Sequence, residues 1–154
     1  MRVIGIDLGE RRIGLAISDA TATLARPVRT LERGTSDVAA IELLSAAIAD
    51  LTADGPLGGV VVGLPTRLDG TDNLQTQRVK KMVALLSARL NVPIATQDER
   101  LSSYEADQRL RLHQKDWRKR KAQLDAAAAA VILQDYLDAR STSGGQGAEG
   151  QGEE

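Results

Sequence analysis

Two short apolar runs at the start of the chain, residues 3–8 and 13–18, constrain its fold more than any other feature. β-Branched and small apolar residues dominate both runs, and the four residues between them are glycine or charged. Two strands joined by so short a polar turn pair in the antiparallel sense. The chain is therefore expected to begin with a β-hairpin whose first strand carries a lone carboxylate, Asp7, near its end.

The rest of the chain alternates helical and strand patterns, which predicts an α/β domain. A helix is expected from a cap at Thr35 or Ser36 to about residue 53, and another over about 73–90. Further strands are expected near 28–31, 59–65 and 93–99, and further helices after a capping box at 102–105 and over about 124–139. These elements predict a mixed five-stranded sheet with helices on both faces.

Composition limits the chemistry that the chain can perform. The 154 residues fit one domain, expected over 1–140, and the polar, glycine-rich residues 141–154 are expected to be disordered. The absence of cysteine and the single His113 exclude a disulfide framework and a metal site of Cys or His ligands. No apolar run approaches the length of a bilayer span, so we expect a cytoplasmic protein without a membrane partner.

Acidic side chains are expected to gather at one edge of the sheet. Asp7 lies near the end of an expected strand, and so do Asp98 and Glu99. Asp125 begins the last expected helix, which could cover the edge of the sheet where these strands end. Carboxylates that converge without a Lys or Arg between them are expected to bind Mg²⁺ or Mn²⁺. Two such ions support phosphodiester hydrolysis, so the pattern indicates a nuclease site.

Each of these features, taken alone, is also compatible with a purely structural role. Asp7 could be a turn residue, Glu99 could lie in a solvated loop, and Asp125 could be favoured by the helix macrodipole. The glycines of the hairpin could cradle a phosphate, but their turn leads into a strand, unlike the dinucleotide fingerprint and the P-loop. Sugar kinases use a similar strand–turn–strand, yet they need two domains and this chain has room for one.

A basic segment precedes the last expected helix. The formal net charge of −1 hides residues 109–121, where Asp116 is the one acid among several Lys and Arg residues. Clustered cations favour contact with a sugar–phosphate backbone, and the alternative is an exposed loop kept soluble by its charge. Trp117 could stack on a base or pin the segment to the body. The candidate phosphate contacts are Lys115, Arg118, Lys119, Arg120 and Lys121.

The order of these motifs over nearly all of residues 1–140 resembles the YqgF/RuvX family of ribonuclease-H-like proteins. GIDLGERRIGLAISD (5–19) is similar to the family's first hairpin, and VVVGLPTRLDGT (60–71) to its central strand and the following loop. DERLSS (98–103) resembles its second acidic motif, and LDAAAAAVILQDYL (124–137) its last helix. Glu10 and the dipeptide at 66–67 depart from the family pattern.

The resemblance implies a ribonuclease-H-like fold and a nuclease that uses two Mg²⁺ or Mn²⁺ ions. It implies that Asp7, Glu99 and Asp125 are both the catalytic residues and the metal ligands. The choice of Glu99 over Asp98 rests on the resemblance, because strand alternation says only that these neighbours face opposite sides.

The family also implies a substrate, namely RNA at the 5′ end of the 16S rRNA precursor. A Holliday junction resolvase, which cuts four-way DNA and needs a two-fold dimer, is the alternative. A non-catalytic RNA-binding factor for ribosome assembly is a third hypothesis. The partner is thus a nucleic acid, with RNA favoured and branched DNA possible, and the protein is expected to be a monomer or a homodimer.

Overall fold

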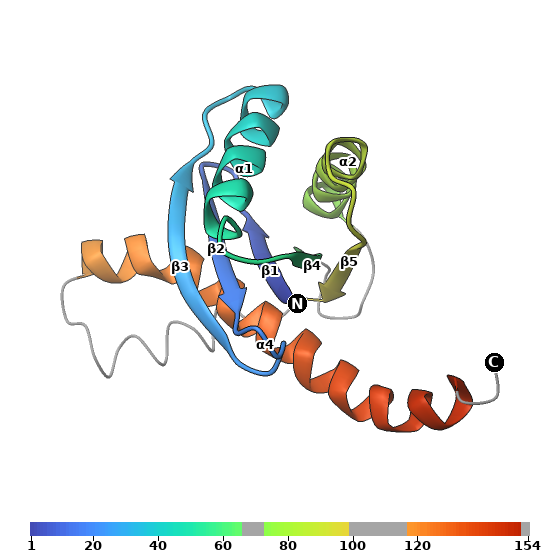
Figure 1. Ribbon diagram of the computed structural model, residues 1–154. Helices are drawn as coiled ribbons and strands as arrows, with labels where there is room; N and C mark the ends of the chain where they lie inside the picture. The colour runs from blue at the N-terminus through green and yellow to red at the C-terminus, as the bar shows by residue number, and fades with distance from the viewer. Residues whose placement is uncertain (66–72, 99–116, 152–154) are drawn as a thin grey trace.

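The computed structural model describes residues 1–65, 73–98 and 117–151, with side chains described up to 141 and, within the last range, only from 124. In these residues the chain forms one sheet and three helices (Figure 1). The strands are β1 (Arg2–Leu8), β2 (Arg12–Ser18), β3 (Ala25–Glu32), β4 (Leu57–Leu64) and β5 (Ile94–Asp98). The helices are α1 (Asp37–Leu51), α2 (Leu74–Arg89) and α4 (Trp117–Gln151).

The sheet is mixed, as the sequence predicts, and its strand order is β3-β2-β1-β4-β5. β1 pairs with β2 in the antiparallel sense, and β2 pairs with β3 in the same way. β1 and β4 are parallel, and so are β4 and β5. The carboxyl ends of β1, β4 and β5 therefore meet at one edge of the sheet.

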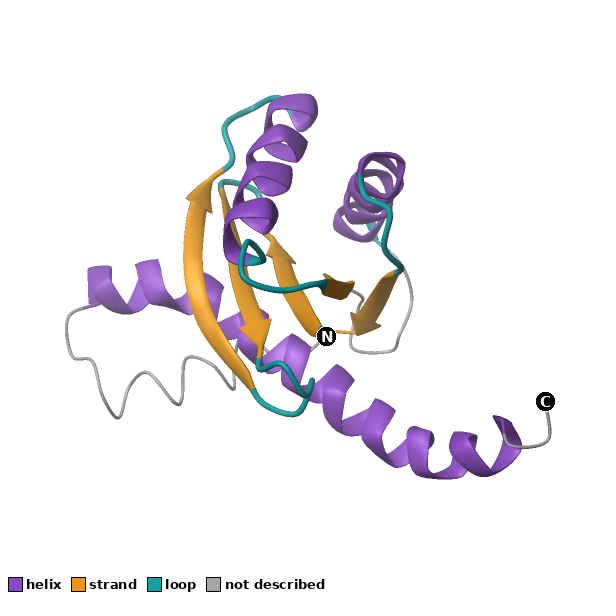
Figure 2. Ribbon diagram, viewed as in Figure 1, coloured by secondary structure: helices purple, strands orange, loops and turns teal. Residues whose placement is uncertain are grey.

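Helices cover both faces of the sheet, which confirms the expected layering (Figures 1 and 2). α1 and α2 lie on one face, and α4 runs across the other. Because successive side chains of a strand point to opposite faces, β1 and β2 supply both cores. The fully buried residues on the α1 and α2 side include Ile4, Ile6, Ile13, Leu15 and Leu44. Those on the α4 side include Ala16, Val61, Ala129, Ile132 and Leu133.

Two glycines allow the backbone of α4 to lie directly on the sheet. A Cβ atom on Gly14 of β2 would lie 1.9 Å from the carbonyl oxygen of Asp125 in α4. A Cβ atom on Gly5 of β1 would lie 2.7 Å from Cβ of Leu133 and 2.9 Å from the carbonyl oxygen of Ala129. All three separations are well below van der Waals contact, so no other residue type fits at either position without moving α4.

Side-chain caps start α1 and α2, and the cap of α1 is one of the two residues expected from the sequence. Ser36 accepts a hydrogen bond from the Ala39 amide at 3.2 Å and is the N-cap of α1. Asn73 and Thr76 form a reciprocal capping box at the start of α2. The buried Thr76 hydroxyl also donates to the carbonyl oxygen of Pro65, which follows β4. This bond ties the start of α2 to the carboxyl end of β4.

α4 differs from the expected helix over 124–139, because it begins at Trp117 and continues to Gln151. Arg, Lys, Ala and Gln are strong helix formers, so the basic residues from 118 onward extend the helix towards its start instead of forming a loop. Asp125 therefore lies inside the helix, and a stabilising role for it in the first turn, next to the macrodipole, is wrong. The domain boundary at residue 140 stays a prediction, and the capping box at 102–105 lies outside the described residues.

The length of α4 does not make it a membrane segment. α4 has 35 residues, but no helix in the described part of the chain combines enough length with enough apolar character to cross a bilayer. Apolar side chains of α4 that pack on the sheet include Ala129, Ile132 and Leu133.

The contact between Gly14 and α4 predicts a strong effect of one added methyl group. We expect Gly14→Ala to lower the free energy of unfolding by more than about 2 kcal/mol, because the methyl group would overlap backbone atoms that cannot rotate away. Gly55→Ala is the control, since no atom lies within 4 Å of its added Cβ. Urea denaturation of both variants measures the effect, and equal stability of the two would contradict the proposed close packing.

Candidate functional site

Asp7 lies near the carboxyl end of β1 and is half-buried. Its side chain belongs to the α4 side of the sheet, because Gly5, two residues earlier, contacts α4 and strand side chains alternate. The next residue, Leu8, packs into the opposite core. The alternation of residues along β1 thus places its single acid on the face of the sheet that α4 covers.

Asp125 reaches the same place from α4. Gly14 is the residue paired in register with Asp7, and the carbonyl group of Asp125 rests on Gly14. Directly paired Cα atoms in antiparallel strands are about 4.5–5.5 Å apart, so Asp7 and Asp125 both adjoin one glycine. The structure therefore brings together two of the three acids that the sequence predicts as a site.

Arg12 adds a cation that the sequence pattern does not reveal. Its Nε atom donates to Oδ2 of Asp125 at 2.7 Å, and the side chains of Arg12 and Asp125 are 31% and 21% exposed. The expectation that the carboxylates converge without a cationic partner is therefore wrong for Asp125. The sequence places Arg12 in a polar turn, but Arg12 precedes Gly14 by two residues and so shares its face of the strand.

The strand register determines the face of the sheet on which Asp98, the last residue of β5, lies. Asp98 is paired with Leu64 of β4, and Leu64 packs against the core on the α1 and α2 side. Asp98 is therefore on the face opposite to Asp7. Glu99, the predicted ligand, lies outside the described residues.

The donor atoms at this edge suit a hard cation. Asp7 and Asp125 offer carboxylate oxygens, which are the ligands that Mg²⁺ and Mn²⁺ prefer. Within residues 1–65, 73–98 and 124–141, no three His, Cys, Asp or Glu side chains are grouped closely enough to hold a metal ion. The third predicted ligand, Glu99, lies outside these residues, and the two carboxylates present fit a divalent-cation site.

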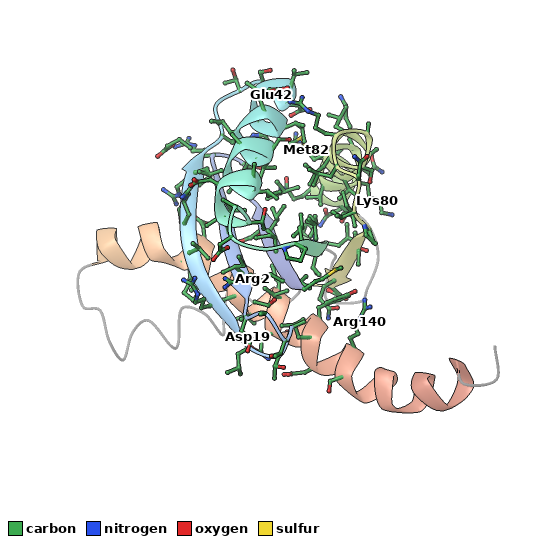
Figure 3. The ribbon with its side chains drawn as sticks, viewed as in Figure 1. Arg2, Asp19, Glu42, Lys80, Met82 and Arg140 are labelled. Carbon is green, nitrogen blue, oxygen red and sulfur yellow. The ribbon has the colours of Figure 1, made fainter. Side chains whose placement is uncertain are left out.

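Asp19, which closes the hairpin motif, has a structural role. Its Oδ1 atom accepts hydrogen bonds from the Thr23 amide at 2.8 Å and the Leu24 amide at 3.3 Å. These bonds, chiefly the one from Thr23, lower the pKa of the exposed Asp19 carboxyl. Figure 3 shows Asp19 at the turn between β2 and β3, at the end of β2 away from its Arg12 end. It is therefore not part of the candidate site.

The last residues of the basic segment lie in α4. Residues 118–121 form part of the first turns of this helix, between four and seven residues before Asp125. At 3.6 residues per turn, they lie one to two turns from it. Lys115 and the side chains of Arg118, Lys119, Arg120 and Lys121 lie outside the described part, so their contact with phosphates stays a prediction.

The comparisons with known proteins agree on one family. A family model described as RuvX, Holliday junction resolvase, matches residues 1–139. A relative from Anaeromyxobacter dehalogenans, provisionally named a pre-16S rRNA nuclease, is 45% identical over 141 residues, which are 92% of this chain and 99% of the relative. A relative from Chloroflexus aggregans with the same name is 44% identical over 138 residues, 90% of this chain and 94% of its own length.

A solved structure identifies the fold independently of close sequence similarity. RuvC of T. thermophilus, in complex with a Holliday junction substrate, superposes with a TM-score of 0.51 over 92% of this chain and 96% of RuvC, at 17% identity. The expected ribonuclease-H-like fold is thereby confirmed. The family model and the close relatives show that the chain belongs to the RuvX family.

The ion pair between Arg12 and Asp125 predicts measurable coupling. In a double-mutant cycle of Arg12→Ala and Asp125→Asn, we expect a coupling free energy of about 1–2 kcal/mol, because the bond is charge-assisted and partly buried. The control cycle uses Arg29 and Asp50, which pair at 2.9 Å on the exposed surface and should couple by less than about 1 kcal/mol. Equal coupling in the two cycles would show that Arg12 does not hold Asp125.

Proposed function

We propose that this member of the RuvX family is a metal-dependent nuclease that hydrolyses phosphodiester bonds at the 5′ end of the 16S rRNA precursor. The observation that carries this proposal is the meeting of Asp7 and Asp125 beside Gly14. The names of the close relatives support the choice of substrate. A cytoplasmic location belongs to the same proposal, because rRNA precursors are processed where ribosomes assemble.

Asp7, Glu99 and Asp125 are the proposed metal ligands and catalytic residues. Because Asp98 faces the α1 and α2 side, the next residue of an extended strand would face α4, which supports Glu99 as the third ligand. Two Mg²⁺ or Mn²⁺ ions held there would supply the activation of a water and the stabilisation of the leaving oxygen.

The chain's own residues prepare this site and hold the substrate. Arg12 binds one carboxylate oxygen of Asp125 and so fixes the orientation of that side chain. The backbone contact between Gly14 and Asp125 fixes the position of α4 on the sheet. The basic residues Lys115, Arg118, Lys119, Arg120 and Lys121 are proposed to bind phosphates on the approach to Asp125.

A Holliday junction resolvase is the second candidate, because the family model carries that description and RuvC was solved with such a junction. Resolution requires two sites related by a two-fold axis, whereas trimming of an RNA end needs one. The third hypothesis, a non-catalytic RNA-binding factor, requires the basic residues and does not require the acids.

Removal of the Asp7 carboxylate tests the catalytic assignment. We expect Asp7→Asn to abolish cleavage and to remove the rise in thermal midpoint caused by Mn²⁺, since a neutral amide binds divalent ions poorly. In EDTA, the thermal midpoint of Asp7→Asn should be only slightly lower than that of the wild type. Asp54→Asn is the control, because Asp54 is an exposed acid with a side chain 74% accessible. Full cleavage by Asp7→Asn would exclude the proposed mechanism.

The same assays distinguish Asp98 from the proposed ligand Glu99. Glu99→Gln should behave like Asp7→Asn, because its carboxylate is the proposed third ligand. Asp98→Asn should keep both cleavage and the response to Mn²⁺. The opposite pattern would contradict the assignment of the ligand.

The substrate is tested by direct comparison of RNA with DNA. A labelled 16S rRNA precursor and a four-way DNA junction are incubated separately with the protein and Mg²⁺ or Mn²⁺, and the mass of the protein in solution is measured. We expect trimming of the RNA without cleavage of the junction. A dimer that makes symmetric nicks in the junction and leaves the RNA intact would establish the second candidate.

A further inference from the structure

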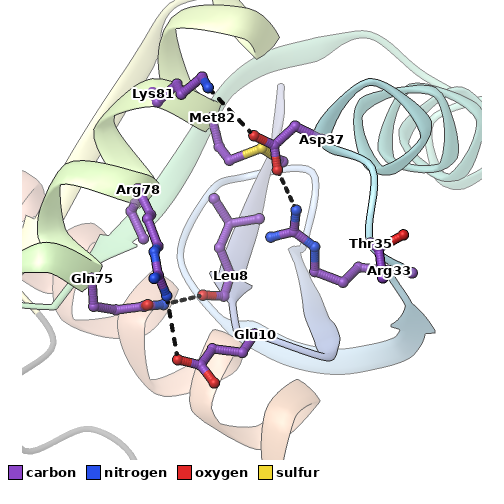
Figure 4. A pocket seen from close by; sticks show the side chains of 11 residues that line it. Leu8, Glu10, Arg33, Thr35, Asp37, Gln75, Arg78, Lys81 and Met82 are labelled. Carbon is purple, nitrogen blue, oxygen red and sulfur yellow. Dashed lines mark hydrogen bonds and ion pairs between the residues drawn. The ribbon is translucent and has the colours of Figure 1, made fainter.

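A pocket of about 500 Å³ opens between α1, α2 and the β1–β2 turn (Figure 4). Leu8, Val79 and Met82 supply apolar lining. Three cationic side chains also line it: Arg33, which follows β3, and Arg78 and Lys81 of α2. Two acidic side chains complete the charged lining. The acids are Glu10 and Asp37, so the lining carries one more positive than negative charge.

The ion pairs made by the two α2 cations are long and exposed. Arg78 approaches Glu10 at 3.6 Å and Lys81 approaches Asp37 at 3.9 Å, and the two basic side chains are 64% and 71% accessible. Pairs of this kind contribute between zero and about 1 kcal/mol. Both cations can therefore exchange these partners for a stronger anion at little cost.

Arg33 is held differently, because its side chain is only 14% accessible. One terminal nitrogen of Arg33 donates a hydrogen bond to Asp37. The Nε atom of Arg33 is buried and has no hydrogen-bond partner among the described residues. Asp37 is also the partner of Lys81, as Figure 4 shows, so one carboxylate serves two cations. A partly desolvated guanidinium with an incomplete set of acceptors favours a further anion nearby.

The pocket adjoins the candidate active site. Leu8 directly follows Asp7 at the carboxyl end of β1, and its side chain lines the pocket on the other face of the sheet. Glu10 lies in the turn that connects this strand to Arg12, the partner of Asp125. A nucleic-acid strand engaged at Asp7 therefore needs only to cross the edge of the sheet to reach Arg78 and Lys81.

We propose that this pocket binds a backbone phosphate of the substrate strand, a few nucleotides from the bond that is cut. Arg33, Arg78 and Lys81 provide the positive charge, and Glu10 competes with the phosphate for Arg78. This inference rests on the proposed nuclease function. It extends the substrate path from the α4 face, where the acids lie, to the α1 and α2 face.

The test measures binding of a short fluorescently labelled single-stranded RNA in EDTA, so that no cleavage occurs. We expect Arg78→Gln with Lys81→Gln to weaken binding and to reduce the slope of log affinity against log salt by about 0.7 for each lost contact. Glu10→Gln should strengthen binding, because it frees Arg78. The thermal midpoint of each variant is measured to show that it is folded.

Matched variants correct for the change in net charge. Lys80→Gln and Arg26→Gln remove two exposed cations that do not line the pocket, and Figure 3 shows Lys80 on the side of α2 away from Met82. Asp54→Asn removes one acid far from the pocket and is the control for Glu10→Gln. The inference predicts that the controls change affinity by clearly less than the pocket variants.

The outcomes separate the two proposals. If the wild-type protein binds no RNA, both the nuclease function and the inference fail. If it binds RNA and the pocket variants match their controls, only the inference fails. If inorganic phosphate binds the wild type but not the double pocket variant while RNA binds both equally, the pocket serves a free anion and the assignment to a substrate strand is wrong.

Discussion

The direct contact of α4 with the sheet is the constraint on which the rest of the structure depends. Side chains normally separate a helix from the sheet that it covers, but Gly5 and Gly14 have none, and the α4 backbone at Ala129 and Asp125 occupies their place. This contact fixes both the distance of α4 from the sheet and the position of α4 along its own axis. Because Gly14 is also paired with Asp7, the contact that positions the helix is the one that brings the two acids together.

The electrostatics of the site follow from that arrangement. Asp7 and Asp125 adjoin the same glycine, so repulsion between their carboxylates opposes folding unless a cation offsets it. Arg12 does so for Asp125 by binding one of its oxygens. On the other face of the same edge, the cations outnumber the acids around the pocket next to Leu8. The proposed metal ligands Asp7 and Asp125 thus lie on the α4 face of this edge, and the pocket with its one excess positive charge lies on the other.

The sequence predicted the features that depend on neighbouring residues. The hairpin follows from two apolar runs and a short turn, and the start of α1 follows from Ser36, whose capping bond is local. The Arg12–Asp125 pair was not predictable, because it joins residues 113 positions apart through the packing of α4. The face of the sheet on which Asp98 lies could not be predicted either. It depends on the register between β4 and β5, because alternation alone does not say which face each residue takes.

The central claim, that Asp7 and Asp125 form a divalent-cation site on the α4 face, is tested most directly by paramagnetic broadening. Small amounts of Mn²⁺ are added to isotope-labelled protein, and the loss of each amide signal is followed by NMR. We predict that the signals of Asp7, Gly14 and Asp125 disappear first, well before those of Asp19 and Gly55 near the opposite edge of the sheet. Broadening centred on Asp19, or equal broadening along the chain, would contradict the site.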